Sequence, residues 1–71
     1  MKELIKKIFK DRIVYNNEEG KIHRGNDLPA VEWNDSGREW WINGKHHRED
    51  GPAVEHTNGD KSWYLNNIEY T

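Results

Sequence analysis

The fold of this chain is decided by Gly44-Lys45-His46-His47-Arg48-Glu49-Asp50-Gly51-Pro52-Ala53-Val54-Glu55, because most of this stretch occurs twice. Lys21-Ile22-His23-Arg24 anticipates its first half by 24 residues, and Pro29-Ala30-Val31-Glu32 anticipates its last four residues by 23. A third block, Trp40-Trp41-Ile42-Asn43, returns as Trp63-Tyr64-Leu65-Asn66. A repeat of this period predicts stacked supersecondary units.

Each repeat unit is predicted to be a β-hairpin. Two turn-rich tetrads, Asn34-Asp35-Ser36-Gly37 and Thr57-Asn58-Gly59-Asp60, separate strand-like runs. If each tetrad is a four-residue loop, Val31 lies opposite Trp40. In the second copy, Val54 lies opposite Trp63 in the same way. This agreement between the copies favours the register.

Tighter turns are predicted between the hairpins. Asn43-Gly44 is typical of a type I′ turn and places Trp41 opposite His46. Asn66-Asn67 is expected to turn the chain in the same way near the C-terminus. Residues 13–23 indicate one more hairpin before the repeats, so the chain is predicted to be an antiparallel meander.

The first twelve residues are predicted to form a short α-helix. Their apolar side chains fall on one helical face, with lysines on the other: Leu4, Ile5, Ile8 and Phe9. A helix this short is not stable alone and must pack on something. Two interpretations stay open: a lid on the end of the sheet, which four apolar residues suit better, or a basic amphipathic helix on a membrane or in a partner's groove.

The predicted fold class is therefore mainly β, in a single domain that spans residues 1–71. It combines an antiparallel β-meander of hairpin repeats of about 23 residues with one short N-terminal α-helix. The expected parts are a helix at 1–12, a first hairpin at 13–23, repeat units at 21–44 and 45–67, and a closing strand at 68–71.

The repeat unit also resembles a known family. The order of residues 44–55, followed by Trp63-Tyr64-Leu65-Asn66-Asn67, is similar to the MORN-like β-hairpin repeats common in bacteriophage and giant-virus proteins. The resemblance covers about residues 20–71 and implies a scaffold with an interaction surface, without a particular activity. The first copy departs from the pattern, since Gly25-Asn26-Asp27-Leu28 replaces the usual acid-Asp-Gly step.

Composition excludes several classes of protein. The chain has no cysteine, so disulfides and thiolate metal sites are ruled out and a reducing compartment such as the cytoplasm is expected. No apolar run is long enough to cross a bilayer, and no signal peptide is recognisable. Residues 1–12 carry a charge of +3 and the remainder −5. An acidic folded part argues against nucleic-acid binding and favours a partner with a basic surface.

Strand alternation sorts the side chains into two predicted faces. The predicted core face carries Val31, Trp40, Ile42, His47, Val54, Trp63, Leu65 and Tyr70. The predicted acidic and aromatic face carries Glu32, Glu39, Trp41, His46, Glu55, Tyr64 and Glu69. From this second face, together with Trp33 opposite Arg38 at the end of its strand, we predict the partner-binding residues: Trp33, Trp41, Tyr64, Glu32, Glu39, Glu55 and Glu69. The alternative is that the N-terminal helix covers Trp41 and Tyr64.

Catalytic and metal chemistry find little support in the pattern. His46 and His47 are adjacent on a strand, so they point to opposite faces and cannot share one ion. Neither Ser36 nor Ser62 lies in a nucleophile elbow. Glu32 and Glu39 are predicted to face each other on one strand pair, but a flat sheet face offers no cleft for glycoside hydrolysis. We predict no catalytic residue, no metal site and no cofactor.

The expected function is that of a non-enzymatic protein–protein interaction module. The resemblance implies a small phage protein that binds and modulates or inhibits a host defence protein in the host cytoplasm. One alternative is a structural role in which the edge strand Ile68–Thr71 pairs with another copy. The other, less favoured, is a metal or small-ligand role for the histidines. Nucleic acid and membrane are not expected partners.

Overall fold

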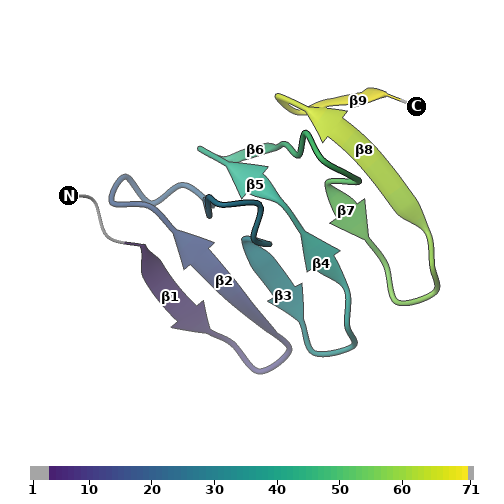
Figure 1. Ribbon diagram of the computed structural model, residues 1–71. Coiled ribbons are helices and arrows are strands. Elements are labelled where there is room, and N and C mark those ends of the chain that lie inside the picture. Colours follow the sequence, from purple (N-terminus) through teal and green to yellow (C-terminus); the bar gives the residue numbers. More distant parts are fainter. Residues whose placement is uncertain (1–3, 71) are drawn as a thin grey trace.

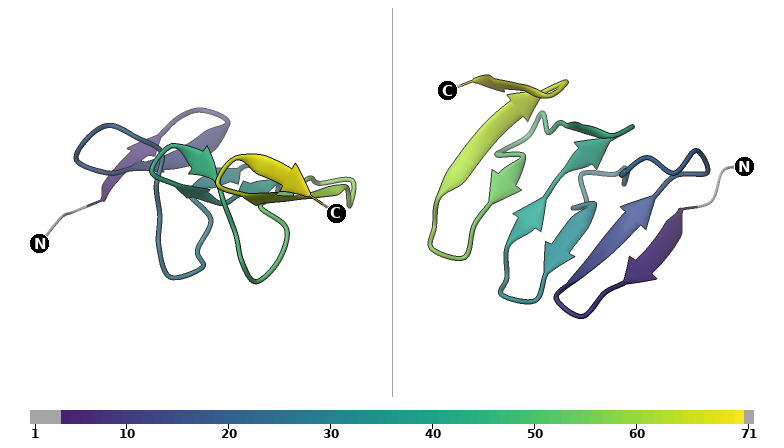
Figure 2. Two further views of the ribbon diagram at one scale, coloured as in Figure 1. Left: turned by 90° about the horizontal axis from the view of Figure 1, so that it is seen from above. Right: turned by 180° about the vertical axis from the view of Figure 1, so that it is seen from behind.

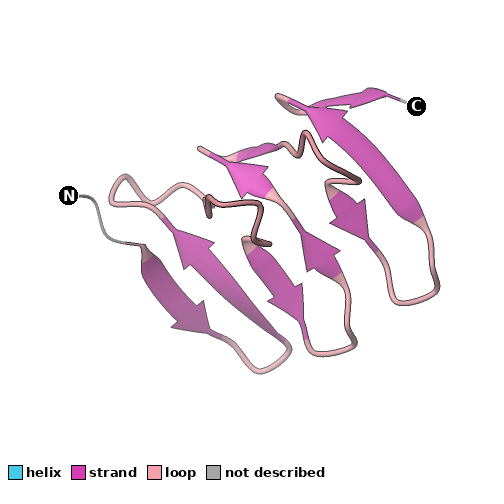
Figure 3. Cartoon of the chain, viewed as in Figure 1, coloured by secondary structure: helices cyan, strands magenta, loops and turns pink. Residues whose placement is uncertain are grey.

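One antiparallel β-sheet organises the computed structural model, which describes residues 4–70 (Figure 1). Its strands are β1 (Ile5–Ile8), β2 (Arg12–Asn16), β3 (Val31–Trp33), β4 (Arg38–Glu39), β7 (Val54–Glu55), β8 (Lys61–Leu65) and β9 (Ile68–Tyr70), side by side in this order. Between β4 and β7 the chain forms a two-stranded ladder of β5 (Trp41–Ile42) and β6 (Lys45–His46). Residues 4–70 contain no helix (Figure 3). The predicted mainly β antiparallel meander is confirmed.

The loop between β3 and β4 is one residue shorter than predicted. The Trp33 amide donates to the Gly37 carbonyl at 2.8 Å, which leaves three residues in the loop. Val31 therefore lies opposite Glu39 and not opposite Trp40. Trp33 correspondingly lies opposite Gly37, so the predicted pairing of Trp33 with Arg38 is wrong.

The loop between β7 and β8 repeats this geometry. The His56 amide donates to the Asp60 carbonyl at 2.8 Å, and Val54 lies opposite Ser62. Gly59 has a φ of +94°, the left-handed conformation that a three-residue hairpin loop requires at its last position. The predicted pairing of Val54 with Trp63 is wrong for the same reason as in the first copy.

A one-residue shift in register moves the side chains of a strand to the other face of the sheet. Two loops, the ones that lead into β3 and β7, project from one side of the sheet (Figure 2). We call that side the loop face and the other side the open face. The loop face carries Tyr15, Glu32, Trp40, Glu55 and Trp63. The open face carries Val14, Val31, Trp33, Glu39, Trp41, Val54 and Tyr64. The predicted faces are thus exchanged in β3 and β7.

The tight turns form as the sequence predicts. Asn43 and Gly44 adopt φ angles of +49° and +81°, and Trp41 lies opposite His46. Asn66-Asn67 turns the chain with φ angles of +50° and +71°. A type I′ turn needs two successive positive φ angles, which Asn and Gly tolerate best. The hairpin at residues 13–23 also forms, through an isolated bridge between residues 16 and 22.

The predicted N-terminal helix is wrong, because Ile5–Ile8 forms strand β1 and pairs with β2. The loop after it closes with the Phe9 amide donating to the Arg12 carbonyl at 2.8 Å. This hairpin is the counterpart of β3–β4 and β7–β8, with Phe9 in the place of Trp33. A four-residue apolar stripe cannot stabilise an isolated helix, whereas the ladder to β2 gives the segment a complete row of partners. Residues 1–3 of the predicted helix lie outside the described residues.

The core has one part between the sheet and the two loops of the loop face, and another in three valines of the open face, Val14, Val31 and Val54. Tyr15, Ala30, Trp40, Ala53 and Trp63 form one row across the sheet, linked by backbone hydrogen bonds such as that from Tyr15 to Ala30 at 2.8 Å. The two alanines are fully buried and Trp40 is 6% exposed. A small side chain between two rings leaves room for each loop to fold down onto the sheet.

The second loop is held down by Arg48. Its guanidinium lies 3.7 Å from the centre of the Trp40 ring and donates to the Pro52 carbonyl at 3.1 Å. It also forms an ion pair with Glu55 at 3.4 Å. Arg48 therefore closes its own loop by binding Pro52 and Glu55, and it packs this loop on the Trp40 ring of the preceding unit.

Arg24 makes the same set of contacts in the first loop. Its guanidinium lies 3.9 Å from the centre of the Tyr15 ring, donates to the Pro29 carbonyl at 3.2 Å and lies 3.8 Å from Glu32. The repetition of His-Arg and Pro-Ala-Val-Glu in the sequence therefore has an architectural cause. Each repeated arginine packs one unit onto the next.

Replacement of Arg48 by lysine is expected to lower the free energy of unfolding by about 2 kcal/mol. Lysine keeps the charge but cannot stack a plane on Trp40 while it donates to several acceptors. Urea denaturation followed by tryptophan fluorescence measures the change. The matched control is Arg38→Lys at the exposed arginine of β4, and equal stability of the two variants would contradict the role given to Arg48.

Proline substitutions distinguish the β1 strand from a helix. In an antiparallel ladder, the amides of successive residues point alternately toward and away from the partner strand. Because the Phe9 amide donates to Arg12, the Lys7 amide also points toward β2 and the Lys6 amide points away from it. Lys7→Pro is expected to lose about 1–2 kcal/mol of unfolding free energy in urea titration, and Lys6→Pro much less. Equal losses for the two variants would contradict the strand.

Candidate functional site

The centre of the open face is the carboxylate of Glu39. The indole Nε1 of Trp33 donates to its Oε2 at 2.8 Å, and that of Trp41 donates to its Oε1 at 3.0 Å. The side chain is 20% exposed. Because a carboxylate accepts hydrogen bonds in the plane of its oxygens, one group fixes the position of two large rings from β3 and β5.

His46 extends this cluster toward the second repeat. Its Nε2 lies 3.3 Å from Oε1 of Glu39, and its ring lies against that of Trp41 with 3.8 Å between centroids. On its other side, the Tyr64 ring stacks at 4.9 Å with an interplanar angle of 29°. Three rings from β5, β6 and β8 thus lie one against the next beside one carboxylate.

A groove of about 500 Å³ lies next to this cluster on the open face. Its floor is formed by Val14 and Val31, which are neighbours in the ladder between β2 and β3 and are both buried. The other lining residues are Lys7, Phe9, Arg12, Asn16, Ile22, Trp33, Glu39 and Trp41. An apolar floor beside aromatic rings is suited to an apolar side chain, and four of the ten lining residues supply polar groups around it.

Arg12 fixes the wall of this groove near the hairpin loops. Its guanidinium lies 4.7 Å from the centre of the Phe9 ring and 5.2 Å from that of Trp33. It also forms an ion pair with Asp11 at 2.8 Å. The wall is therefore built by two consecutive hairpins, since Phe9 and Trp33 occupy the same position in their respective units.

The structure brings together only part of the predicted site. Trp33, Glu39 and Trp41 form the cluster, and Tyr64 joins it through His46. Glu69 lies opposite Tyr64 and is exposed. The other two predicted residues, Glu32 and Glu55, lie on the loop face and are paired with arginines. The predicted face-to-face arrangement of Glu32 and Glu39 is also wrong, because they lie on opposite faces.

Sequence reasoning missed the contribution of the N-terminal hairpin to the groove. Lys7, Phe9, Arg12 and Val14 line it, but the predicted helix placed the first three elsewhere. A signal was present in the spacing: Phe9 precedes Trp33 by 24 residues, the offset that also separates the two Lys-x-His-Arg blocks. Extending the repeat toward the N-terminus would have identified the strand.

The repeated histidines have structural contacts. Nδ1 of His23 accepts the backbone N–H of Asn43 at 3.0 Å, and Nδ1 of His47 accepts that of Asn66 at 3.0 Å. Each histidine therefore supports the tight turn at the end of its own unit. Within the described part of the chain, no three His, Cys, Asp or Glu side chains converge to hold a metal ion.

No protein-family model, no curated protein and no solved structure matches this chain. In residues 4–70 there is no helix of the length and apolar character needed to span a membrane. Both oxygens of Glu39 already accept hydrogen bonds, so this carboxylate positions two indoles beside an apolar groove.

Removal of the Glu39 carboxylate is expected to release two of the four tryptophans. In Glu39→Ala, the indole N–H resonances of Trp33 and Trp41 should shift and exchange faster with solvent, since both lose their acceptor. The resonance of Trp40 should stay, because its Nε1 donates to the Asp27 carbonyl at 3.0 Å. Two-dimensional ¹H–¹⁵N spectra measure these changes.

The matched control for this experiment is Glu32→Ala, which removes a carboxylate from the opposite face of the neighbouring strand. It should leave the Trp33 and Trp41 resonances in place. Unchanged indole resonances in Glu39→Ala would show that this carboxylate does not hold the cluster.

Proposed function

We propose that this protein is a non-enzymatic protein-binding module that binds its partner on the open face. The observation that carries the proposal is the groove on Val14 and Val31, flanked by the rings that Glu39 fixes. Trp33 and Trp41 are half-buried, so each ring is held in place and still presents part of its surface to solvent. Large rings held rigid before binding lose little conformational entropy when a partner arrives.

The groove favours a partner that inserts an apolar side chain between Trp33 and Trp41. Burial of such a side chain against Val14 and Val31 gives the hydrophobic contribution, and indole rings at the rim exclude water. Most energy in protein interfaces comes from a few such anchors, with Trp among the most frequent.

The charge of the open face is less acidic than the sequence predicts. Glu32 and Glu55 are occupied by arginines on the other face, while Lys7 and Arg12 border the groove. A strongly basic partner surface is therefore not required. Lys7 and Glu39 lie at opposite ends of one row across four strands, roughly 14 Å apart. Their opposite charges therefore favour one orientation of a bound segment along this row.

Size and the resemblance to MORN-like repeats support a narrower form of the proposal. Proteins with such repeats are common in bacteriophages, and a domain of 71 residues acts most simply by covering the surface of a larger protein. We propose that the partner is a host protein of the bacterial cytoplasm, such as a defence protein, whose activity is modulated or inhibited by this occupation.

Titration of open-face variants against a captured partner tests the proposal. The tagged protein is used to isolate a partner from bacterial lysate, and the purified partner is then titrated by calorimetry. Trp41→Ala is expected to weaken binding by about tenfold or more, because truncation of an aromatic anchor costs roughly 2 kcal/mol. The double variant with Glu39→Lys should abolish binding.

Arg38→Ala is the control for this titration, because Arg38 is exposed and its side chain lies on the loop face of the same hairpin. It should bind like the unmodified protein. Binding that is equally strong in Trp33→Ala, Trp41→Ala and the control would show that the open face is not the interface.

A further inference from the structure

A second and smaller cavity lies on the open face beside the groove, and we call it the notch. Its volume is about 190 Å³, and Trp33 and Glu39 line both cavities. Its floor is formed by Gly37 and Val54, which are both buried. The register places Gly37 between Trp33 and His56, on neighbouring strands. The notch is therefore open because residue 37 has no side chain between these two rings.

The preceding hairpin fills the corresponding place with an arginine. Arg12 occupies the position of Gly37, since each accepts the amide of the ring residue that precedes its hairpin loop. The Arg12 guanidinium lies 4.7 Å from the centre of the Phe9 ring and 5.2 Å from that of Trp33. It also pairs with Asp11, the second residue of the loop, at 2.8 Å. This hairpin thus holds a guanidinium against two rings and beside an aspartate.

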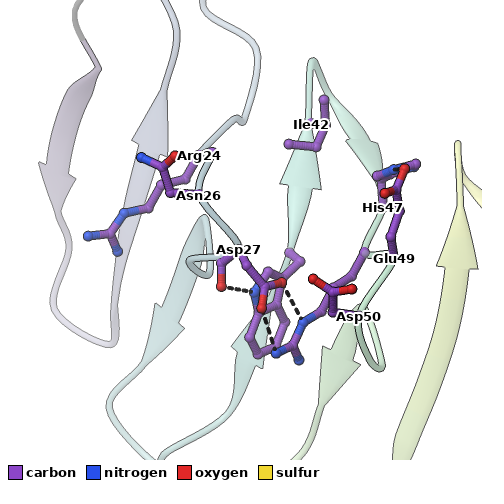
Figure 4. A pocket seen from close by; sticks show the side chains of 10 residues that line it. Arg24, Asn26, Asp27, Ile42, His47, Glu49 and Asp50 are labelled. Atoms are coloured by element: carbon purple, nitrogen blue, oxygen red, sulfur yellow. Dashed lines mark hydrogen bonds and ion pairs between the residues drawn. The ribbon is translucent and has the colours of Figure 1, made fainter.

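A ring and an aspartate also hold an arginine in the pocket between the two loops of the loop face (Figure 4). The Arg48 guanidinium lies 3.7 Å from the centre of the Trp40 ring. Its Nε and Nη2 lie 2.9 Å and 3.4 Å from the two carboxylate oxygens of Asp27. Cation–π contact and charge-assisted hydrogen bonds act together on one planar group. The chain therefore uses the same combination for a guanidinium in two separate places.

The notch offers this combination without a cation. Asp35, the second residue of its own loop, lines the notch, and its Oδ1 accepts the Gly37 amide at 3.1 Å. The same oxygen would lie 3.3 Å from a Cβ at residue 37, so the carboxylate stands where that side chain would begin. Glu39 adds a second negative charge. Within residues 4–70, no lysine or arginine lines the notch. Negative charge beside two rings favours a planar cation.

We propose that the notch binds an arginine side chain of the partner protein, with its guanidinium against the Trp33 ring and hydrogen-bonded to Asp35. The inference rests on the function proposed for the open face, because the same partner would place an apolar side chain in the groove. The floors of the two cavities lie two strands apart, which is roughly 10 Å. The partner is therefore expected to present an arginine and an apolar residue at this separation.

The probe is a blocked Gly-Arg-Gly tripeptide, titrated to tens of millimolar into the ¹⁵N-labelled full-length protein at pH 8. The indole resonance of Trp33 and the amide of Gly37 are expected to shift. The indoles of Trp40 and Trp63 should stay, because both lie on the loop face. Tripeptides with citrulline or lysine in place of arginine should bind about threefold more weakly or worse, because citrulline lacks the charge and lysine lacks the plane.

Variants of the protein separate the acid from the open space. Asp35→Asn keeps an oxygen for the Gly37 amide but removes the charge, and it should weaken the arginine peptide about threefold. Glu19→Gln is the matched control, since Glu19 is an exposed acid in the turn after β2. It should bind like the unmodified protein. Gly37→Arg should abolish the response, because its own guanidinium fills the notch as Arg12 fills the place before it.

The stability of the Gly37→Arg variant gives a readout that needs no peptide. Residue 37 lies outside the left-handed region, so a side chain there is not strained by its φ angle. Gly37→Gln introduces the same Cβ beside Asp35 without the charge. The arginine variant should therefore unfold at a higher urea concentration than the glutamine variant. Should either variant fail to fold, the three peptides and Asp35→Asn still decide the question.

Three results would overturn the arginine site. They are unmoved Trp33 and Gly37 resonances, an equal response to the arginine peptide and a control peptide, and an arginine variant no more stable than the glutamine variant. A partner that is lost on Trp41→Ala but binds Asp35→Asn and Gly37→Arg at full strength would also overturn it, and would leave the function proposed for the open face intact. Binding of the arginine peptide at the notch, with a partner unaffected by Trp41→Ala, would support the notch and remove the groove as the interface.

Discussion

The stack depends on one arrangement: a guanidinium held over a ring of the preceding unit while it bonds to its own loop. Arg48 contacts Trp40, Asp27, Glu55 and the Pro52 carbonyl at once. A domain of this size buries little apolar surface, and only six apolar residues among those described are fully in the core. Charged side chains that bridge units therefore replace part of what a larger core would provide.

The repeat and its tight turns could be predicted because both leave local signals. A type I′ turn requires positive φ at two positions, which Asn43-Gly44 announces directly. The longer loops leave no such signal, since Asn34 to Gly37 fits three or four residues equally well. That single residue decides on which face Val31 and Glu32 lie. Of the seven predicted site residues, Trp33 and Trp41 both donate to the carboxylate of a third, Glu39. Two others, Glu32 and Glu55, were lost to the register shift.

The N-terminal strand shows a different limit of sequence reasoning. The apolar residues at positions 4, 5, 8 and 9 match the spacing of a helical face. A strand of four residues is too short to show a distinct alternating pattern that would favour a strand instead. The outcome is set by tertiary pairing with β2, which local periodicity does not encode. The repeat itself indicates this strand, because Phe9, Trp33 and His56 occupy equivalent positions and each precedes a hairpin loop.

The two faces of the sheet are under different constraints. On the loop face, equivalent positions hold chemically similar residues, as in Tyr15, Trp40 and Trp63. On the open face Val31 and Val54 also match, but another set of equivalent positions differs, namely Val14, Glu39 and Ser62. Packing of unit on unit fixes the rings of the loop face, whereas nothing in the stacking requires the differing open-face positions to match. The open face is therefore the face on which this fold allows more variation from unit to unit.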